Sequence, residues 1–249
     1  MRLDSNTILI TGGGAGIGRG LAEALHALGN HVVIGGRREG VLREVCGANP
    51  GMSHVALDVA DRRSIHAALE TVTARFPDLN CLVNNAGIQR AHDFSVTGGV
   101  NDEAVEEEVW TNLVGLAWMC SAFLPLLTRR PEAAVINVSS GLAFVPLARF
   151  PIYCATKAAV HSFCVSLRHQ LKDSSVKVIE LIPPMVDTNL GQGRPRPARM
   201  AMPLAQFIAE AMEGLSGDAD EVAVGNAKSL RAGAGDGEAL RQAFSRMNP

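Results

Sequence analysis

Short apolar runs alternate with longer amphipathic stretches along most of the chain. The short runs predict strands and the longer stretches predict helices with one apolar face. The expected strands cover residues 7–11, 31–35, 54–57, 81–84, 134–138 and 176–182, with a short one near 222–224. The expected helices run from the glycine loop to about residue 28, and over residues 39–46, 62–76, 102–127, 151–172 and 204–215. This alternation is typical of parallel strands joined by crossover helices.

Glycine-rich or polar segments lie at the carboxyl ends of five of these strands. They are T-G-G-G-A-G-I-G at 11–18, Asp58, N-N-A-G at 84–87, Ser139 with Ser140, and P-P-M-V-D-T at 183–188. Doubly wound sheets bind ligands at this edge. We therefore predict an α/β fold, a single-domain doubly wound parallel sheet (Rossmann-like) with helices on both faces. One domain is expected over residues 1–249, with a mobile substrate lid around 189–203, where Gly, Pro and Arg are frequent.

Composition and charge limit the classes of partner that the protein is expected to bind. The formal charge is −2 and no long basic run is present, so nucleic acid is not an expected partner. The first residues lack the apolar core of a signal peptide, and no apolar run approaches the ~20 residues that span a bilayer, which favours a cytoplasmic protein without a membrane partner. The five cysteines are odd in number and lack C-x-x-C spacing. They are expected to be free thiols, and no metal site is predicted.

The most informative chemistry lies on the predicted helix over residues 151–172. Tyr153 is the only tyrosine of the chain, and Lys157 follows four residues later, on the same helix face. A positive charge beside a phenol favours the phenolate and brings its pKa toward the working range of a general acid/base. Ser140 precedes Tyr153 by thirteen residues and can hydrogen-bond the same substrate oxygen. The pair alone also occurs by chance on many helices, so its weight comes from the surrounding motifs.

The first loop has the spacing Gly12-x-x-x-Gly16-x-Gly18 and opens a helix. Glycines allow the backbone to approach a pyrophosphate, and the helix N-terminus favours its charge. The acidic residue that would bind the ribose 2′-hydroxyl of NAD is missing after the second strand, where Gly36 is followed by Arg37 and Arg38. Arg37 can hold a 2′-phosphate instead, which predicts NADP(H) as the preferred cofactor, with NAD(H) possible. The other interpretation is a solvated arginine pair that opens a loop.

These motifs together with Asn112 and Y-C-A-T-K at 153–157 resemble the short-chain dehydrogenase/reductase family, in its single-domain branch and more narrowly its DltE-like subgroup. The resemblance implies a catalytic tetrad: Asn112, Ser140, Tyr153 and Lys157. Tyr153 would be the general acid/base, Lys157 would also bind the nicotinamide ribose, and Asn112 would hold a relay water. The implied cofactor residues are Gly12, Gly16, Ile17, Gly18, Asp58, Val59, Asn84, Ala86, Gly87, Tyr153, Lys157, Pro183, Val186 and Thr188.

The expected substrate pocket is largely apolar. Its candidate residues are Leu142, Phe144, Val145, Arg149, Phe150, Pro184 and Met185. Pro184 departs from the glycine that usually follows Pro183 in this family, and it stiffens the wall near the nicotinamide. Arg149 is a candidate contact for an anionic substrate. Because a strand alternates its faces, Ser139 is expected to be a structural hydrogen bonder beside Ser140.

The sequence thus predicts an NADP(H)-dependent oxidoreductase that interconverts a carbonyl and a secondary alcohol, acting on a small-molecule substrate. One alternative is a non-catalytic NADP(H)-binding redox sensor that acts through a protein partner, which would not need the tetrad. A nucleotide-sugar epimerase or dehydratase is a third class, and such enzymes usually need a larger carboxyl-terminal domain than the residues after Thr188 provide. The resemblance also implies a homodimer or homotetramer that pairs the helices over 102–127 and 151–172.

Overall fold

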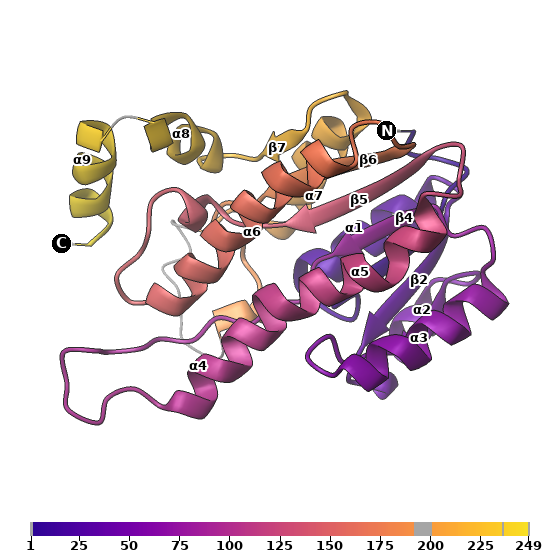
Figure 1. Ribbon diagram of the computed structural model, residues 1–249, viewed down its shortest axis with the longest axis horizontal. Helices are drawn as coiled ribbons and strands as arrows, with labels where there is room; N and C mark the ends of the chain where they lie inside the picture. Colours follow the sequence, from indigo (N-terminus) through magenta and orange to yellow (C-terminus); the bar gives the residue numbers. More distant parts are fainter. Residues whose placement is uncertain (1, 192–200, 236, 249) are drawn as a thin grey trace.

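The computed structural model describes residues 2–191, 201–235 and 237–248. Within them, seven parallel strands form one sheet in the order β3-β2-β1-β4-β5-β6-β7 (Figure 1). The strands are β1 Thr7–Thr11, β2 His31–Gly36, β3 Ser53–Ala56, β4 Cys81–Asn84, β5 Ala133–Val138, β6 Val176–Ile182 and β7 Glu221–Ala223. The strand order reverses between β1 and β4, which is the topological switch point of a doubly wound sheet. The predicted fold class is confirmed, and every predicted strand is present within one residue at either end.

Helices cover both faces of this sheet (Figure 1). They are α1 Gly16–Ala27, α2 Glu39–Ala48, α3 Arg62–Arg75, α4 Asp102–Val109, α5 Gly115–Leu127, α6 Pro151–Gln170, α7 Leu204–Ser216, α8 Ala227–Ala232 and α9 Gly237–Met247. The side chains of β1 divide between two cores, because successive residues of a strand point to opposite faces. Ile8 and Ile10 pack with α1, α2 and α7. Leu9 packs with α3, α5 and α6.

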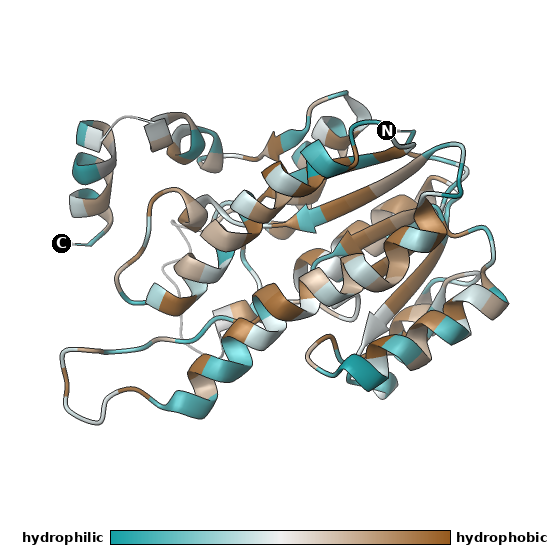
Figure 2. Ribbon diagram, viewed as in Figure 1, coloured by the Kyte–Doolittle hydropathy of each residue, from teal (hydrophilic) through white to brown (hydrophobic). Residues whose placement is uncertain are grey.

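Burial on both faces explains the apolar strand runs, which appear as brown arrows in Figure 2. The exceptions are polar residues that lie inside the sheet, among them Asn137 and Glu180, both fully buried. Their partners belong to the site described below. The helices around the sheet alternate between teal and brown segments, as expected of helices with one polar and one apolar face (Figure 2).

The predicted helix over residues 102–127 is present as one continuous helical segment, but it contains an unpredicted π-helical turn at Trp110–Val114 between α4 and α5. Asn101 caps its start by accepting a hydrogen bond from the Ala104 N–H at 2.7 Å. Gly115 follows the π turn at a point where any Cβ would collide with the Val59 carbonyl oxygen. The helix therefore lies against the loop after β3, and the π turn places Asn112 toward the sheet edge.

This segment, Asp102–Leu127, is long and apolar enough to cross a membrane by length and composition. The expectation that no such stretch exists was therefore wrong. The structure shows another reason for its apolar character, since Leu116, Met119 and Phe123 are buried in the core with α3 and α6. Core helices of soluble proteins pass the same test of length and composition.

The carboxyl-terminal helices α8 and α9 were not predicted. They extend beyond β7 (Figure 1), and the chain end reaches the loop between β5 and α6. Asn248 donates a hydrogen bond to the Pro146 carbonyl at 3.1 Å and accepts one from the Ala148 N–H. Most of the predicted lid at 189–203 falls outside the described residues. Val186, which precedes the predicted lid, pairs in an isolated bridge with Met202, which is near the lid's carboxyl end. The two ends of the predicted lid therefore lie together.

Candidate active site

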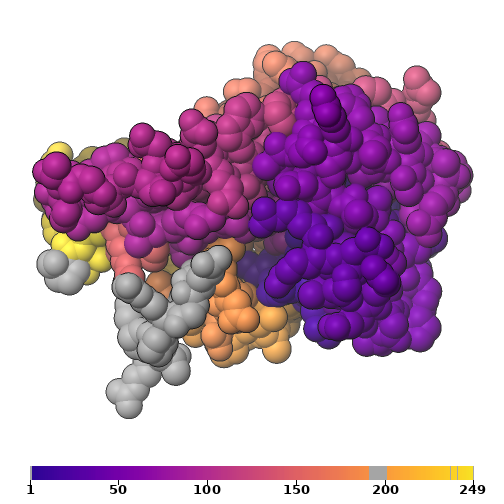
Figure 3. All heavy atoms as spheres, turned by 90° about the horizontal axis from the view of Figure 1, so that it is seen from below, coloured from indigo at the N-terminus to yellow at the C-terminus, as the bar shows by residue number. Residues whose placement is uncertain are grey.

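The carboxyl ends of β1 and β4 are fastened together at the switch point. The Thr11 hydroxyl accepts hydrogen bonds from the Asn85 and Ala86 N–H groups at 2.9 and 3.0 Å. The Asn85 amide donates to the Thr11 carbonyl at 2.9 Å. Seen from below, the surface is hollowed between the indigo and purple N-terminal half and the orange segment after residue 200 (Figure 3). Asn85 was not among the predicted site residues, although the alternation of a strand favours it once Asn84 points inward.

The glycine loop fits a pyrophosphate at the start of α1. Gly12 and Gly16 have φ of +67° and +54°, which side chains other than glycine rarely adopt. A Cβ at Gly18 would collide with the Gly12 carbonyl oxygen, so this glycine is required by packing within the loop. Ala15 is the N-cap of α1 and provides no side-chain cap, which leaves the first N–H groups of the helix available to an anion. Thr188 lies opposite, with carbons 3.4 Å from a Cβ built on Gly16.

The predicted adenosine residues divide into two groups. Asp58 holds its own loop, since its carboxylate accepts a hydrogen bond from the Ala60 N–H at 3.0 Å. The Asn84 side chain is buried beneath the site, where it donates to the Asn137 amide oxygen at 2.9 Å and approaches the Cys120 sulfur at 3.3 Å. The structure thus gives the Asn84 side chain a role inside the sheet and leaves Asn85, Ala86 and Gly87 in the loop that follows β4.

Arg37, the predicted 2′-phosphate ligand, is exposed and ion-paired with Glu107 of α4 at 3.7 Å. Glu107 also forms an ion pair with Arg90. A carboxylate therefore lies beside the guanidinium at the expected phosphate position. Sequence reasoning missed it, because Glu107 belongs to an acidic stretch that is seventy residues away along the chain.

Helix α6 presents Tyr153 and Lys157 at the same sheet edge. Both side chains are buried, and the Lys157 ammonium lies 5.7 Å from the centre of the Tyr153 ring. It donates a hydrogen bond to the Val138 carbonyl, the last residue of β5, at 2.8 Å. Burial lowers the pKa of Lys157 to about 8, while the neighbouring Cys164 and Glu180 act in the opposite direction. Burial raises the pKa of Cys164 itself to about 12, so its thiol is neutral near pH ~7.

The two serines after β5 have different partners, as the alternation of a strand predicts. Ser140 accepts a hydrogen bond from the Leu142 N–H at 3.1 Å and caps the turn Gly141–Ala143. Ser139 donates to the carboxylate of Glu180 on β6 at 2.5 Å. Ser139 is therefore a structural hydrogen bonder, and Ser140 is the serine on the side of the predicted site.

Asn112 joins the loop after β4 to helix α6. Its amide group donates to the Ile88 carbonyl and its oxygen accepts from the Ile88 N–H, both at 2.8 Å. The same amide nitrogen lies 3.3 Å from the Thr156 hydroxyl. A Cβ built on Gly87 would lie 3.2 Å from the Asn112 oxygen and 3.7 Å from the Lys157 nitrogen, so these two side chains flank Gly87. The structure thus brings Asn112 and Lys157 to one place.

A buried pair that the sequence did not reveal holds the same loop. Glu108 of α4 lies 3.0 Å from the His92 ring nitrogen and accepts a hydrogen bond from the Arg90 N–H at 3.0 Å. Burial raises the pKa of Glu108, against the opposing effect of these hydrogen bonds. The backbone N–H of His92 donates to the Arg149 carbonyl at 3.3 Å. Glu108 therefore ties α4 to the loop after β4, and His92 ties that loop to the one before α6.

The predicted pocket residues differ in exposure. Phe144 is buried against His161, with ring centres 4.8 Å apart, and the Arg231 guanidinium lies 5.0 Å from its ring. Met185 is exposed, and the Arg149 guanidinium lies 5.5 Å from the Phe150 ring. Phe144 is thus a fixed part of the wall, whereas Met185 and Arg149 are free to meet a ligand from the surface side.

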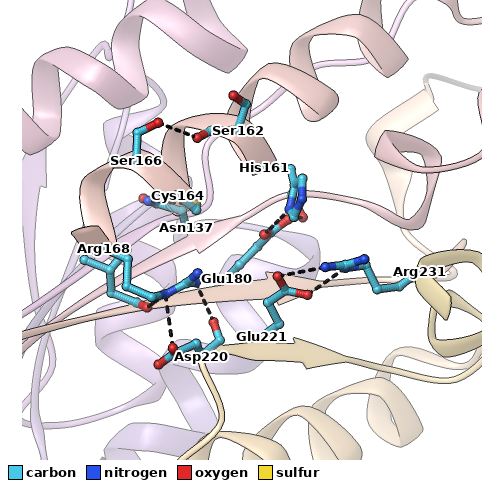
Figure 4. A network of polar contacts seen from close by, with 12 residues as sticks. Asn137, His161, Ser162, Cys164, Ser166, Arg168, Glu180, Asp220, Glu221 and Arg231 are labelled. Carbon is cyan, nitrogen blue, oxygen red and sulfur yellow. Dashed lines mark hydrogen bonds and ion pairs between the residues drawn. The ribbon is translucent and has the colours of Figure 1, made fainter. Parts of the chain in front are cut away.

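A cluster of possible metal ligands lies behind this wall. The ligand atoms of His161, Glu180 and Glu221 are all within 4.8 Å of one another. Each already has a protein partner (Figure 4): Glu221 binds the Arg231 guanidinium at 2.7 and 3.2 Å, and His161 binds Glu180 at 2.7 Å. Arg231 supplies the cation that balances Glu221, and Glu180 has Ser139 and His161 as its partners, so these protein contacts explain the cluster.

Comparisons with known proteins agree with this geometry. Residues 6–198 match the short chain dehydrogenase family model. The uncharacterized oxidoreductase DltE of Bacillus subtilis is 50% identical over 193 residues, 77% of this chain and 76% of DltE. An NADP-dependent 3-hydroxy acid dehydrogenase of Schizosaccharomyces pombe is 29% identical over 193 residues, 75% of this chain and 74% of its own.

Solved structures give the same result. A short chain dehydrogenase from Burkholderia cenocepacia in complex with NADP has a TM-score of 0.85 and 29% identity, and each chain is covered to 99%. A 3-ketoacyl-(acyl-carrier-protein) reductase from Brucella melitensis complexed with NADH has a TM-score of 0.81 and 26% identity, over 90% of this chain and 98% of its own. The predicted family and a nicotinamide cofactor are thereby supported, and the chain belongs to the short-chain dehydrogenase/reductase family of oxidoreductases.

Proposed function

We propose that this protein is an NADP(H)-dependent oxidoreductase that interconverts a carbonyl and a secondary alcohol. The observation that carries the proposal is the placement of a buried Tyr153 and a buried Lys157 on one face of α6, at the carboxyl edge of the sheet beside Ser140. A merely structural helix has little reason to bury a lysine there, because burial disfavours its charge.

Each tetrad residue has a distinct task in this reaction. Nicotinamide, when bound, gives or takes the hydride. Tyr153 gives a proton to the carbonyl oxygen in reduction and removes it in oxidation, and the positive charge of Lys157 favours its phenolate form. Ser140 holds the same substrate oxygen. Asn112 fixes the Ile88 backbone beside Lys157 and is suited to hold a relay water there.

The preference for NADP(H) rests on Arg37 and on the missing acidic residue after β2. An arginine there can bind a 2′-phosphate through charged hydrogen bonds. Relatives with NADP and with NADH are both found among the solved structures, so the preference is argued from this chain's own residues. Replacing Arg37 by Gln should weaken NADPH more than NADH; an unchanged ratio of the two affinities would refute the assignment of Arg37.

We also propose that the protein acts in the cytoplasm as a homodimer or homotetramer. The helical segment 102–127 and α6 carry exposed apolar residues, Trp110 at 42% and Val165 at 48% exposure. Such residues on two neighbouring helices fit a self-complementary interface. Sedimentation of the wild type and of a Val165→Glu variant tests this, since the charge should dissociate the oligomer.

The reaction is tested by NADPH consumption with a panel of ketones, aldehydes and keto acids. Wild-type protein should turn over at least one class, and Tyr153→Phe should lose about 10²–10⁴-fold in rate, the usual contribution of a general acid. Tight NADPH binding without turnover across the panel, alike in wild type and variant, would refute the enzyme and favour a redox sensor. The intact tetrad supports the enzyme, because a sensor would need only the cofactor residues.

A further inference from the structure

Three consecutive residues at the end of β5 connect the proposed catalytic groups to the interior. The Val138 carbonyl accepts the hydrogen bond of Lys157, Ser139 donates to Glu180, and Ser140, the proposed catalytic serine, accepts from the Leu142 N–H. Any displacement of Ser139 would therefore move both of its neighbours.

That partner, Glu180, is a fully buried carboxylate in the middle of β6. One of its oxygens accepts from Ser139 at 2.5 Å and the other lies 2.7 Å from the His161 ring nitrogen. His161 follows Lys157 by one turn of α6 and thus lies on the same helix face. Figure 4 shows Glu180 reaching His161 from the strand below. One side chain therefore fastens both the end of β5 and the helix that bears Tyr153 and Lys157.

The other charged groups around Glu180 have acidic partners of their own. Arg231 of α8 is held in two places by Glu221 of β7. Arg168 of α6 donates to the Val178 carbonyl and pairs with Asp220 at 3.4 Å. His161 contacts Glu180 directly, at 2.7 Å. Among the lysines and arginines around Glu180, Lys157 is the one without a carboxylate partner in the described ion pairs.

We propose that Glu180 is a positioning residue of this site, whose buried negative charge keeps Lys157 protonated and whose hydrogen bonds fix Ser139 and α6 in place. The inference rests on the proposed function for its effect on turnover, but not for its effect on Lys157. A carboxylate in a low-dielectric interior acts over a longer range than one in water. The direction agrees with the opposing effects on the pKa of Lys157, which burial lowers and which the neighbouring Cys164 and Glu180 raise.

The effect on Lys157 is measured directly by NMR of protein with ¹³C-labelled lysine. The chain has only four lysines, and a Lys157→Met sample assigns the signal. Glu180→Gln keeps the size of the side chain but removes its charge. The pKa of Lys157 should therefore fall by about 0.5–1 unit, which is below the 1–3 units expected for a directly adjacent charge. Glu221→Gln is the matched control, and it should leave the titration of Lys157 where it is in the wild type.

An unchanged Lys157 titration in a folded Glu180→Gln variant would overturn the proposal, and so would an equal shift in Glu221→Gln. If Glu180→Gln does not fold, Glu180→Asp carries the test. Glu180→Asp keeps the negative charge but shortens the side chain by one methylene. A smaller lowering of the Lys157 pKa is therefore expected, and an unchanged pKa would refute the charge effect.

Turnover gives a second readout. Glu180→Gln should lower kcat at least several-fold with little change in the KM for NADPH, and the alkaline limb of its pH profile should move to lower pH. Glu221→Gln should keep the wild-type profile. If the wild type turns over nothing while the NMR shift is present, the proposed reaction fails and the role of Glu180 toward Lys157 stands. If both variants are active and neither shifts the pH profile, the positioning role is overturned.

Discussion

Replacing Lys157 by Met removes a buried charge and should stabilise the fold in a pH-dependent manner. Burial lowers the pKa of Lys157 from 10.5 to about 8. At ~1.4 kcal/mol per pKa unit, this difference corresponds to about 3 kcal/mol of stability that the charged lysine costs. Met fills a similar volume without the charge.

The sign follows from proton linkage. The unfolded chain holds the Lys157 proton up to about pH 10.5, whereas the folded chain releases it near 8. Below about 8 the folded state carries the full cost of the buried ammonium. Between the two values the unfolded state binds more protons, so stability rises with pH, and above 10.5 the cost is gone. The advantage of Lys157→Met over the wild type should therefore shrink by about 2–3 kcal/mol between pH ~7 and ~10.

Urea unfolding of both proteins across this pH range measures the difference, from which the titrations of groups that do not interact with Lys157 cancel. The hydrogen bond to Val138 that the variant loses adds an offset that does not vary with pH in this way. Lys172→Met, at an exposed position of the chain, is the matched control and should show no such trend. A Lys157→Met difference that stays constant over the range would refute the buried ammonium.

Two further substitutions test the cofactor site. Glu107→Gln removes the carboxylate beside Arg37, so NADPH should bind a few-fold more tightly while NADH is unaffected; Glu106→Gln, on an exposed position of the same helix, is the control in titrations of both cofactors. An equal change in the affinities for both cofactors would show that Glu107 does not act on the binding of the 2′-phosphate. Gly18→Ala forces a Cβ into the Gly12 carbonyl and should cost about 1–3 kcal/mol in thermal or urea unfolding and weaken NADPH binding. Gly47→Ala in α2, where a Cβ meets nothing within 4 Å, should instead be neutral or stabilising, and equal losses in both variants would contradict the steric argument.

The sequence predicted the central strands well because they are buried on both faces and therefore appear as mostly apolar runs, whereas the edge strands β3 and β7 are short and only partly buried. Tyr153 and Lys157 were placed correctly on one helix face since an i, i+4 spacing fixes that relation locally. The long helix was also predicted, but its π turn was not, because the turn depends on the close approach of Gly115 to Val59, a contact between distant segments. Helix α8 has only six residues, too few to show a periodic pattern. Helix α9 does have apolar residues at helical spacing, so the sequence contained a signal for it that was not used.

The partners of the candidate site were harder to predict than its reactive residues. Glu108 and Glu180 look like ordinary acidic residues in the sequence, and only the fold shows that both are fully buried. For Glu180 a signal existed, since a carboxylate inside an apolar strand of a parallel sheet requires a buried partner. Asn84 and Asn85 could also have been distinguished, because successive residues of a strand face opposite sides.

The structure suggests why a site of this kind needs such buried acids. A lysine acts on a neighbouring phenol most strongly when water is excluded, because Coulomb interactions grow as the dielectric constant falls. The same exclusion of water disfavours the ammonium and lowers the pKa of Lys157 to about 8. A second buried charge of opposite sign, Glu180, relieves this conflict without exposing the lysine. Stability and activity should accordingly move in opposite directions in Lys157→Met, whereas Glu180→Gln should reduce activity because it leaves the lysine buried and less often charged.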